Sequence, residues 1–157
     1  MDTMETLGDQ INFAWEEKYP LEDTLLGGIG LNKSQVLQLM TKFENPIGER
    51  AHRDRALLYV LLRTVLGASE VILLRWSGSV QNDEGETFFM IPGKKGHIRY
   101  ASPGREALGF VQAYQDFCGV SDLLFLSLPD RATNNLRHQL TSRGLRKIIS
   151  GWKRISN

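Results

Sequence analysis

The spacing of apolar residues changes twice along this chain, and this change limits the possible folds more than any other feature. Apolar residues recur at helical spacing from residue 31 to about residue 75. Residues 79–101 are β-prone, with Thr87-Phe88-Phe89-Met90-Ile91 as the strongest run, and helical spacing returns after Pro103. The sequence therefore predicts an α+β fold that is mostly helical, with a small antiparallel sheet of two or three strands.

Capping residues and chain breakers set the expected limits of the first helices. A short amphipathic helix is expected near residues 4–17. Asn32 and Gln35 form a predicted capping box for a helix that continues to about residue 43. The next helix is expected to start near Ala51, with Arg53, Asp54 and Arg55 at its solvent-exposed end. Ser69 is the predicted cap of a short helix over residues 70–75.

Two more helices are expected after the strands, one from about Pro103 and one over about residues 141–155. Residues 122–127 form a short buried extended segment between them. The turns Asp83-Glu84-Gly85 and Gly93-Lys94-Lys95-Gly96 separate the strands. Helical spacing predicts these inward-facing side chains: Ala107, Leu108, Val111, Tyr114 and Phe117, then Leu145, Ile148, Ile149 and Trp152. Tyr59 and Tyr100 are also expected in or beside the core.

Composition excludes several classes of protein. The 157 residues fit one domain, and 41% of them are hydrophobic, which is enough for a core. A single cysteine, Cys118, excludes an internal disulfide and fits a reducing compartment. The three histidines are far apart, and no apolar run reaches the roughly 18 residues of a membrane span. With an acidic N-terminus unlike a signal peptide, we expect a cytoplasmic protein with no metal ion, no cofactor and no membrane contact.

Charge is distributed unevenly along the chain. Residues 1–30 hold seven acids against one lysine, and residues 131–157 hold seven arginines and lysines with no acid. A basic end of this kind is typical of a nucleic-acid-binding face, although a solvated helix face beside an acidic tail would give the same count. We expect residues 1–30 to be an acidic tail and hinge, and residues 31–157 to form the folded part.

Five segments, taken in order, resemble the catalytic domain of the tyrosine recombinases, the phage-integrase family. No single segment is specific, but their order along the chain indicates the family fold. The segments are RDRALL at 53–58, TVLGASEV at 64–71 with the LRW that follows, IPGKKGHIR at 91–99, DLLFLS at 122–127 and LTSRGLRKII at 140–149.

The resemblance implies a function in DNA recombination or integration, with duplex DNA as the partner. Members of the family break and rejoin DNA strands with a tyrosine nucleophile, and arginines and a lysine hold the scissile phosphate. Lys95 matches the hairpin lysine, which serves as a general acid for the leaving hydroxyl, and Lys94 is the neighbouring alternative. A pair of turn lysines that protects a sheet edge is the other interpretation. Glu70 matches a mainly structural acid and is expected to cap the helix after Gly67.

Two departures from the family pattern indicate that this chain is catalytically incomplete. Gly67 stands where the family's first arginine is expected, and glycine offers no charge to a phosphate. The chain ends at Asn157, about where the family would continue to its second catalytic box and its tyrosine. We therefore expect a truncated, front-half version of the recombinase catalytic domain. The motif NNLRH at residues 134–138 resembles the second box, but it precedes residues 140–149 and lacks the leading histidine.

Sequence reasoning thus leaves three functions open. The first is a DNA-binding protein that has lost catalysis. The second is an enzyme fragment that lacks its C-terminal catalytic half. The third is an interaction module that binds a full-length recombinase or a second copy of itself. For the first, the expected phosphate contacts are Lys94, Lys95, Arg99, Arg143, Arg146, Lys147 and Arg154.

Overall fold

The computed structural model describes residues 30–155, apart from residues 65, 120 and 135. The predicted helix near residues 4–17 and the acidic tail up to residue 29 lie outside the described residues.

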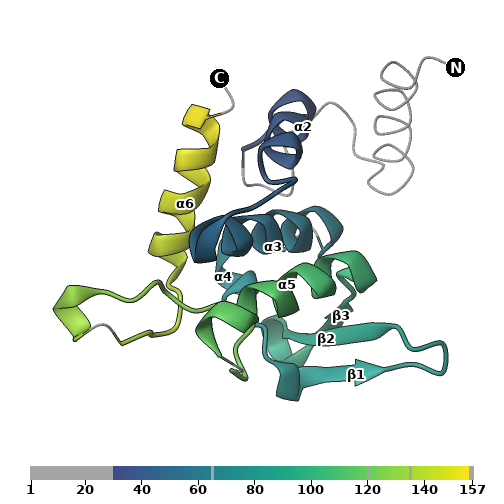
Figure 1. The fold of residues 1–157 in the computed structure, drawn as a ribbon. Coiled ribbons are helices and arrows are strands. Elements are labelled where there is room, and N and C mark those ends of the chain that lie inside the picture. The colour runs from purple at the N-terminus through teal and green to yellow at the C-terminus, as the bar shows by residue number, and fades with distance from the viewer. Residues whose placement is uncertain (1–29, 65, 120, 135, 156–157) are drawn as a thin grey trace, which may run out of the picture.

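The elements follow one another in the order that the apolar spacing predicts, and the α+β fold is confirmed (Figure 1). The three strands form one antiparallel sheet in the order β1-β2-β3, so that β2 is central. Between the helices and strands lie three short 3₁₀ turns, η1 to η3. The bounds are α2 (Lys33–Lys42), α3 (Gly48–Thr64), α4 (Ala68–Val71), η1 (Trp76–Gly78), β1 (Ser79–Gln81), β2 (Thr87–Pro92), η2 (Lys94–Gly96), β3 (Ile98–Ala101), α5 (Gly104–Cys118), η3 (Arg131–Thr133) and α6 (Ser142–Ile155).

Helices α3 and α5 form the centre of the molecule. Leu57, Val60 and Leu61 of α3 are buried with Val111 and Tyr114 of α5, as the apolar stripes of the two helices require. Figure 1 shows α2 and α6 on one side of this pair and the sheet on the other. The core therefore reaches from the sheet to α6, and α6 is attached to the body along its apolar face.

The sheet presents one face to the core. Phe89 and Ile91 of β2 are buried, and Phe89 lies against the Trp76 ring with centroids 5.6 Å apart. In the register of β2 and β3, Phe89 is opposite Ala101 and Ile91 is opposite Arg99. Directly opposed residues point to the same side of an antiparallel pair, so Arg99 also lies on the inner face.

The predicted capping box of α2 is confirmed. The Gln35 N–H donates to Asn32 Oδ1 at 2.9 Å, and the Asn32 N–H donates to Gln35 Oε1 at 3.0 Å. The predicted cap of the third helix is wrong. Helix α4 begins at Ala68 and its N-cap is Gly67 rather than Ser69, because the Glu70 carboxylate accepts a hydrogen bond from the Gly67 N–H at 3.1 Å.

The predicted exposure of Arg53 is wrong, since its residue is only 6% exposed. Its guanidinium pairs with Asp54 at 2.9 Å, which lets the long stem pack against the helix surface. Arg55 lies over the Phe110 ring, 4.0 Å from the centroid.

Two aromatic side chains are exposed against expectation: Phe117, which was expected to face inward, and Tyr100, which was expected in or beside the core. Phe117 stands at the last turn of α5, where its ring meets that of His52. Tyr100 lies on the outer face of the sheet, opposite Met90. Residue spacing alone did not separate the two faces of so short a strand.

Candidate functional site

Helix α6 separates its side chains into an apolar face and a basic face. Leu145, Ile149 and Trp152 are buried at spacings of four and three residues, and the Trp152 ring meets that of Phe43 edge-on. The helix contains no acidic residue, and Lys153 and Arg154 stand in its last turn. The apolar face therefore fixes the helix to the core and turns its cations outward.

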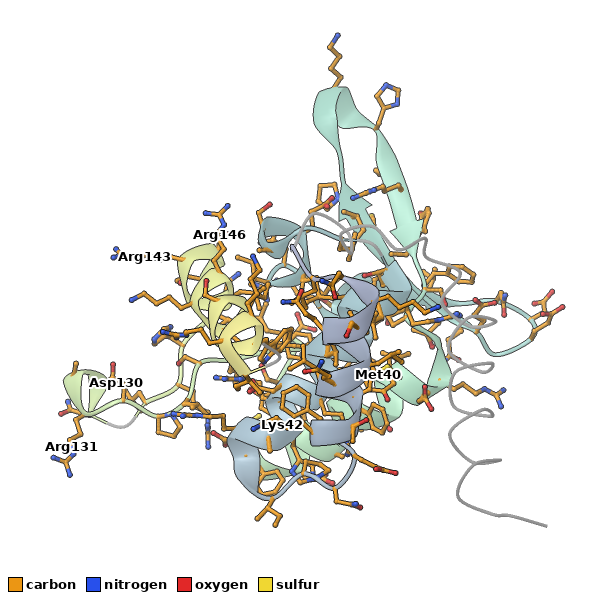
Figure 2. All side chains as sticks on the ribbon, turned by 90° about the horizontal axis from the view of Figure 1, so that it is seen from above. Met40, Lys42, Asp130, Arg131, Arg143 and Arg146 are labelled. Atoms are coloured by element: carbon orange, nitrogen blue, oxygen red, sulfur yellow. The ribbon has the colours of Figure 1, made fainter. Side chains whose placement is uncertain are left out.

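The outward side of α6 borders an open hollow of about 540 Å³. Arg143 and Arg146 point away from the body of the protein (Figure 2). In the part of the chain that the structure describes, the four cations Arg143, Arg146, Lys147 and Arg154 make no ion pair. The hollow is lined by Arg143, Arg146, Lys147, Ser150, Lys153 and Arg154. We call this set of residues the α6 basic face.

Several other arginines are neutralised by acids. Arg53 pairs with Asp54, Arg75 with Asp122 at 3.4 Å, and Arg137 with Glu49 at 2.6 Å.

The last of these pairs involves the NNLRH motif and joins distant parts of the chain. Hydrogen bonding to Glu49 raises the pKa of Arg137, so this guanidinium is held in its charged form. Arg137 therefore attaches the loop of residues 129–139 to the start of α3. This is a structural role for the arginine of the motif that resembled a second catalytic box.

The tip of the β2–β3 hairpin has a constrained backbone. Lys95 has φ 59° and ψ 33°, a left-handed conformation that is unfavourable for a side chain with a Cβ. The Gly93 N–H donates to the His97 carbonyl at 2.7 Å, and a Cβ on Gly93 would come within 2.6 Å of that same oxygen. The glycine therefore closes the turn, and Lys95 is exposed at its tip.

Three residues from two segments meet on the inner side of the hairpin. Arg99 of β3 forms an ion pair with Glu70 of α4, and the same carboxylate caps Gly67. Partial burial acts to raise the pKa of Glu70, but the hydrogen bonds from Arg99 and the Gly67 N–H and the charge of Arg99 outweigh it. The pKa of Glu70 therefore lies below its ordinary value of 4.5. The expectation that Glu70 caps α4 is confirmed.

The structure thus divides the expected phosphate contacts among three places. Arg143, Arg146, Lys147 and Arg154 come together on α6, Lys94 and Lys95 lie in η2 at the hairpin tip, and Arg99 lies on the inner face of the sheet with Glu70. Sequence reasoning missed Lys153 as a member of the basic face. Its position three residues after Ser150 and seven after Arg146 carried the signal on a helical wheel.

Tyr59 and Tyr114 have structural roles in the fold. Burial raises the pKa of Tyr59 to about 12. Burial also raises the pKa of Tyr114, whose hydroxyl accepts from the Leu126 N–H and lies 3.1 Å from the Leu126 carbonyl. A nucleophilic phenol needs the opposite, a lowered pKa or an adjacent base.

Comparison with known proteins decides the family. The model of the phage integrase family matches residues 30–157. The chain belongs to the phage integrase family. This confirms the resemblance drawn from the five segments, and it assigns to this integrase-family chain a function of the integrase or recombinase kind. A search of curated proteins found no significant match.

In the described part of the integrase-family chain, no helix is both long enough and apolar enough to cross a membrane. Across residues 30–155, apart from the three positions left out, no group of three or more His, Cys, Asp and Glu side chains could hold a metal ion.

Proposed function

We propose that this integrase-family protein binds duplex DNA through the α6 basic face and the hairpin tip, and that it does not cut DNA by itself. The observation that carries the proposal is the contrast among its cations. Arg53, Arg75, Arg99 and Arg137 are neutralised by acids, whereas four cations on one side of α6 have no acidic partner among the described residues. Phosphates supply the charge that this face lacks.

The dimensions of the basic face suit a phosphate backbone. Arg143 and Arg154 are separated by a helix length of about 16 Å at a rise of 1.5 Å per residue. Duplex DNA carries one negative charge per about 1.7 Å of its axis, so a stripe of this length lies alongside several phosphates. Contacts of this kind give affinity and position without reading bases.

The inactivity rests on Gly67. Strand cleavage collects negative charge on the phosphate in the transition state, and preorganised cations must meet it. Gly67 gives none at the position of the family's first arginine, and the guanidinium of Arg99 is engaged with Glu70, the residue that caps Gly67. Burial raises the pKa of both Tyr59 and Tyr114, the opposite of what a nucleophilic phenol needs. Supplying further protein segments would leave the charge deficit at Gly67 in place.

The binding part is tested by fluorescence anisotropy with a duplex of roughly 30 base pairs over a salt series. We expect log affinity to fall with log salt at a slope of about −3 to −6, which corresponds to three to six or so neutralised phosphates. Absence of binding at low salt would contradict the proposal.

The catalytic part is tested with a nicked duplex that traps a covalent protein–DNA adduct on a denaturing gel. We expect no adduct from the intact chain. An adduct that disappears in the Lys95→Ala variant would show that the protein cleaves DNA and would overturn this part of the proposal while leaving the binding part intact.

A further inference from the structure

The outer face of the sheet is apolar, and most of its side chains are exposed. The register places Val80 opposite Phe88, Met90 opposite Tyr100 and Pro92 opposite Ile98, so these six side chains share one side of the sheet. Val80, Met90, Ile98 and Tyr100 are each 45–57% exposed. A contiguous apolar surface of this kind is often functional.

The outer face differs from the usual pattern for a small antiparallel sheet. A sheet with one side on the core normally alternates apolar residues inward with polar residues outward. Here β2 is apolar on both sides, with Phe89 and Ile91 inward and Phe88, Met90 and Pro92 outward. The inner face already packs on the core, so the second apolar face is available for a partner.

The two ends of the sheet carry opposite charge. Asp83, Glu84 and Glu86 are exposed at the β1–β2 turn, and Lys95 is exposed at the β2–β3 turn. The two turns lie at opposite ends of β2 because successive hairpins reverse the chain direction. Arg105 approaches the acidic turn near Gly85 and offsets part of its charge, but three acids against one arginine leave that end negative.

We propose that the outer face of the sheet binds a second copy of this chain. A two-fold axis lying between the sheets and perpendicular to the strands brings the two apolar faces together and reverses the strand direction. Such an axis places the Lys95 turn of each copy over the acidic turn of the other. The alternative axis, parallel to the strands, would oppose like charges at both ends. The surface is thus self-complementary in charge as well as apolar, which an isologous dimer requires.

The size of the face predicts a weak dimer. Three strands about 4.8 Å apart, with β2 of about 3.3 Å per residue, give a face of roughly 300 Å². Stable complexes bury about 800 Å² per partner. We therefore expect reversible association that is visible at high micromolar concentration and absent at low concentration. This inference does not depend on DNA binding.

The experiment is sedimentation velocity of the full chain without DNA, from low micromolar to several hundred micromolar concentration. We expect a concentration-dependent dimer in the wild type, and monomer throughout in Met90→Glu and Tyr100→Glu. Ile47→Glu is the matched control, because Ile47 is an exposed apolar residue outside the sheet, and it should dimerise as the wild type does. Circular dichroism confirms that each variant is folded.

A charge exchange gives a second test that leaves the apolar face untouched. Lys95→Glu alone and Glu84→Lys alone should each weaken the dimer, and the double variant should recover most of the association. A monomeric wild type at every concentration would overturn the proposal. So would a dimer that persists in Met90→Glu and Tyr100→Glu, or a double variant no stronger than the single ones.

Discussion

The α6 basic face and the β2–β3 hairpin both present cations to solvent, but they hold them in different ways. On α6, the buried residues Leu145, Ile149 and Trp152 fix a regular helix, and the cations follow from its geometry. On the hairpin, Lys95 stands at a left-handed turn beside Lys94, and Arg99 is turned inward to Glu70. For the proposed DNA binding, we expect α6 to supply most of the electrostatic affinity and the hairpin tip to supply a smaller, positioned part of it.

The largest effect in this series is expected from replacing Trp152, the side chain that holds α6 against the core. Trp152 is buried against Phe43, so Trp152→Ala should lower the free energy of unfolding by about 3–5 kcal/mol, from lost burial and the cavity left behind. Urea denaturation measures the change. Ile155→Ala, an exposed position in the same helix, should change it by less than about 0.5 kcal/mol. Equal effects of the two substitutions would contradict the anchoring role.

The second largest effect is expected from removing positive charge from α6. The triple variant Arg143→Ala, Arg146→Ala and Arg154→Ala should weaken DNA binding by about two to three orders of magnitude at low salt and reduce the salt slope by about 3. Anisotropy titration measures both quantities.

The matched control for this variant removes three exposed cations from elsewhere, Lys42, Arg50 and Arg105. Lys42 lies apart from Arg143 and Arg146 in Figure 2. The control should retain most of the wild-type affinity. If both triple variants lose affinity equally, binding follows net charge rather than the α6 basic face.

Adding charge beside the hairpin should have a smaller effect of opposite sign. Gly67 has an ordinary negative φ, and a Cβ there would lie 3.8 Å from the nearest atom, Glu70 Oε1, so a side chain fits. Gly67→Arg should strengthen DNA binding several-fold and steepen the salt slope by about 0.9, the effect of one more phosphate contact. Gly67→Ala is the control and should bind as the wild type does. No difference between the two would mean that this side of the hairpin does not face DNA.

The hairpin tip itself should contribute less to DNA affinity than the α6 basic face does. Asparagine tolerates the left-handed conformation and carries no charge, so Lys95→Asn separates the charge from the turn. We expect a loss of affinity of about three- to five-fold, the weight of a single phosphate contact, with a thermal midpoint within about 2 °C of the wild type. A loss as large as that of the α6 triple variant would reverse the ranking of the two regions.

The ion pair behind the hairpin should have the smallest effect, and it depends on pH. The pKa of Glu70 is lowered in the folded state, so its stabilising contribution is present above the ordinary value of 4.5 and is lost as pH falls through the lower folded-state value. The pair is partly exposed, which limits this contribution to a few tenths of a kcal/mol. Glu70→Gln should therefore destabilise slightly at pH 7 and not at pH 3 in urea titrations. A difference that grows on acidification would contradict the sign.

Much of the fold and part of the site could be predicted because their signals are local. The Asn32 and Gln35 capping box, the Gly93 turn and the apolar stripe of α6 each depend on residues a few positions apart. The four cations of α6 were expected from the basic charge of residues 131–157. Lys153 was not among the expected phosphate contacts, although its spacing from Arg146 and Ser150 puts it on the same side of the helix.

The sequence by itself determined which segments are helices and strands and which faces carry charge, because periodicity and capping are short-range properties. Only the tertiary structure decided which charges are neutralised. Arg99 meets Glu70 across 29 positions of sequence, and Arg137 meets Glu49 across 88. It also decided that Tyr100 is exposed, because a strand of four residues is too short for its pattern to show which face meets the core. Such outcomes depend on how elements pack against each other, and packing is set by the whole chain.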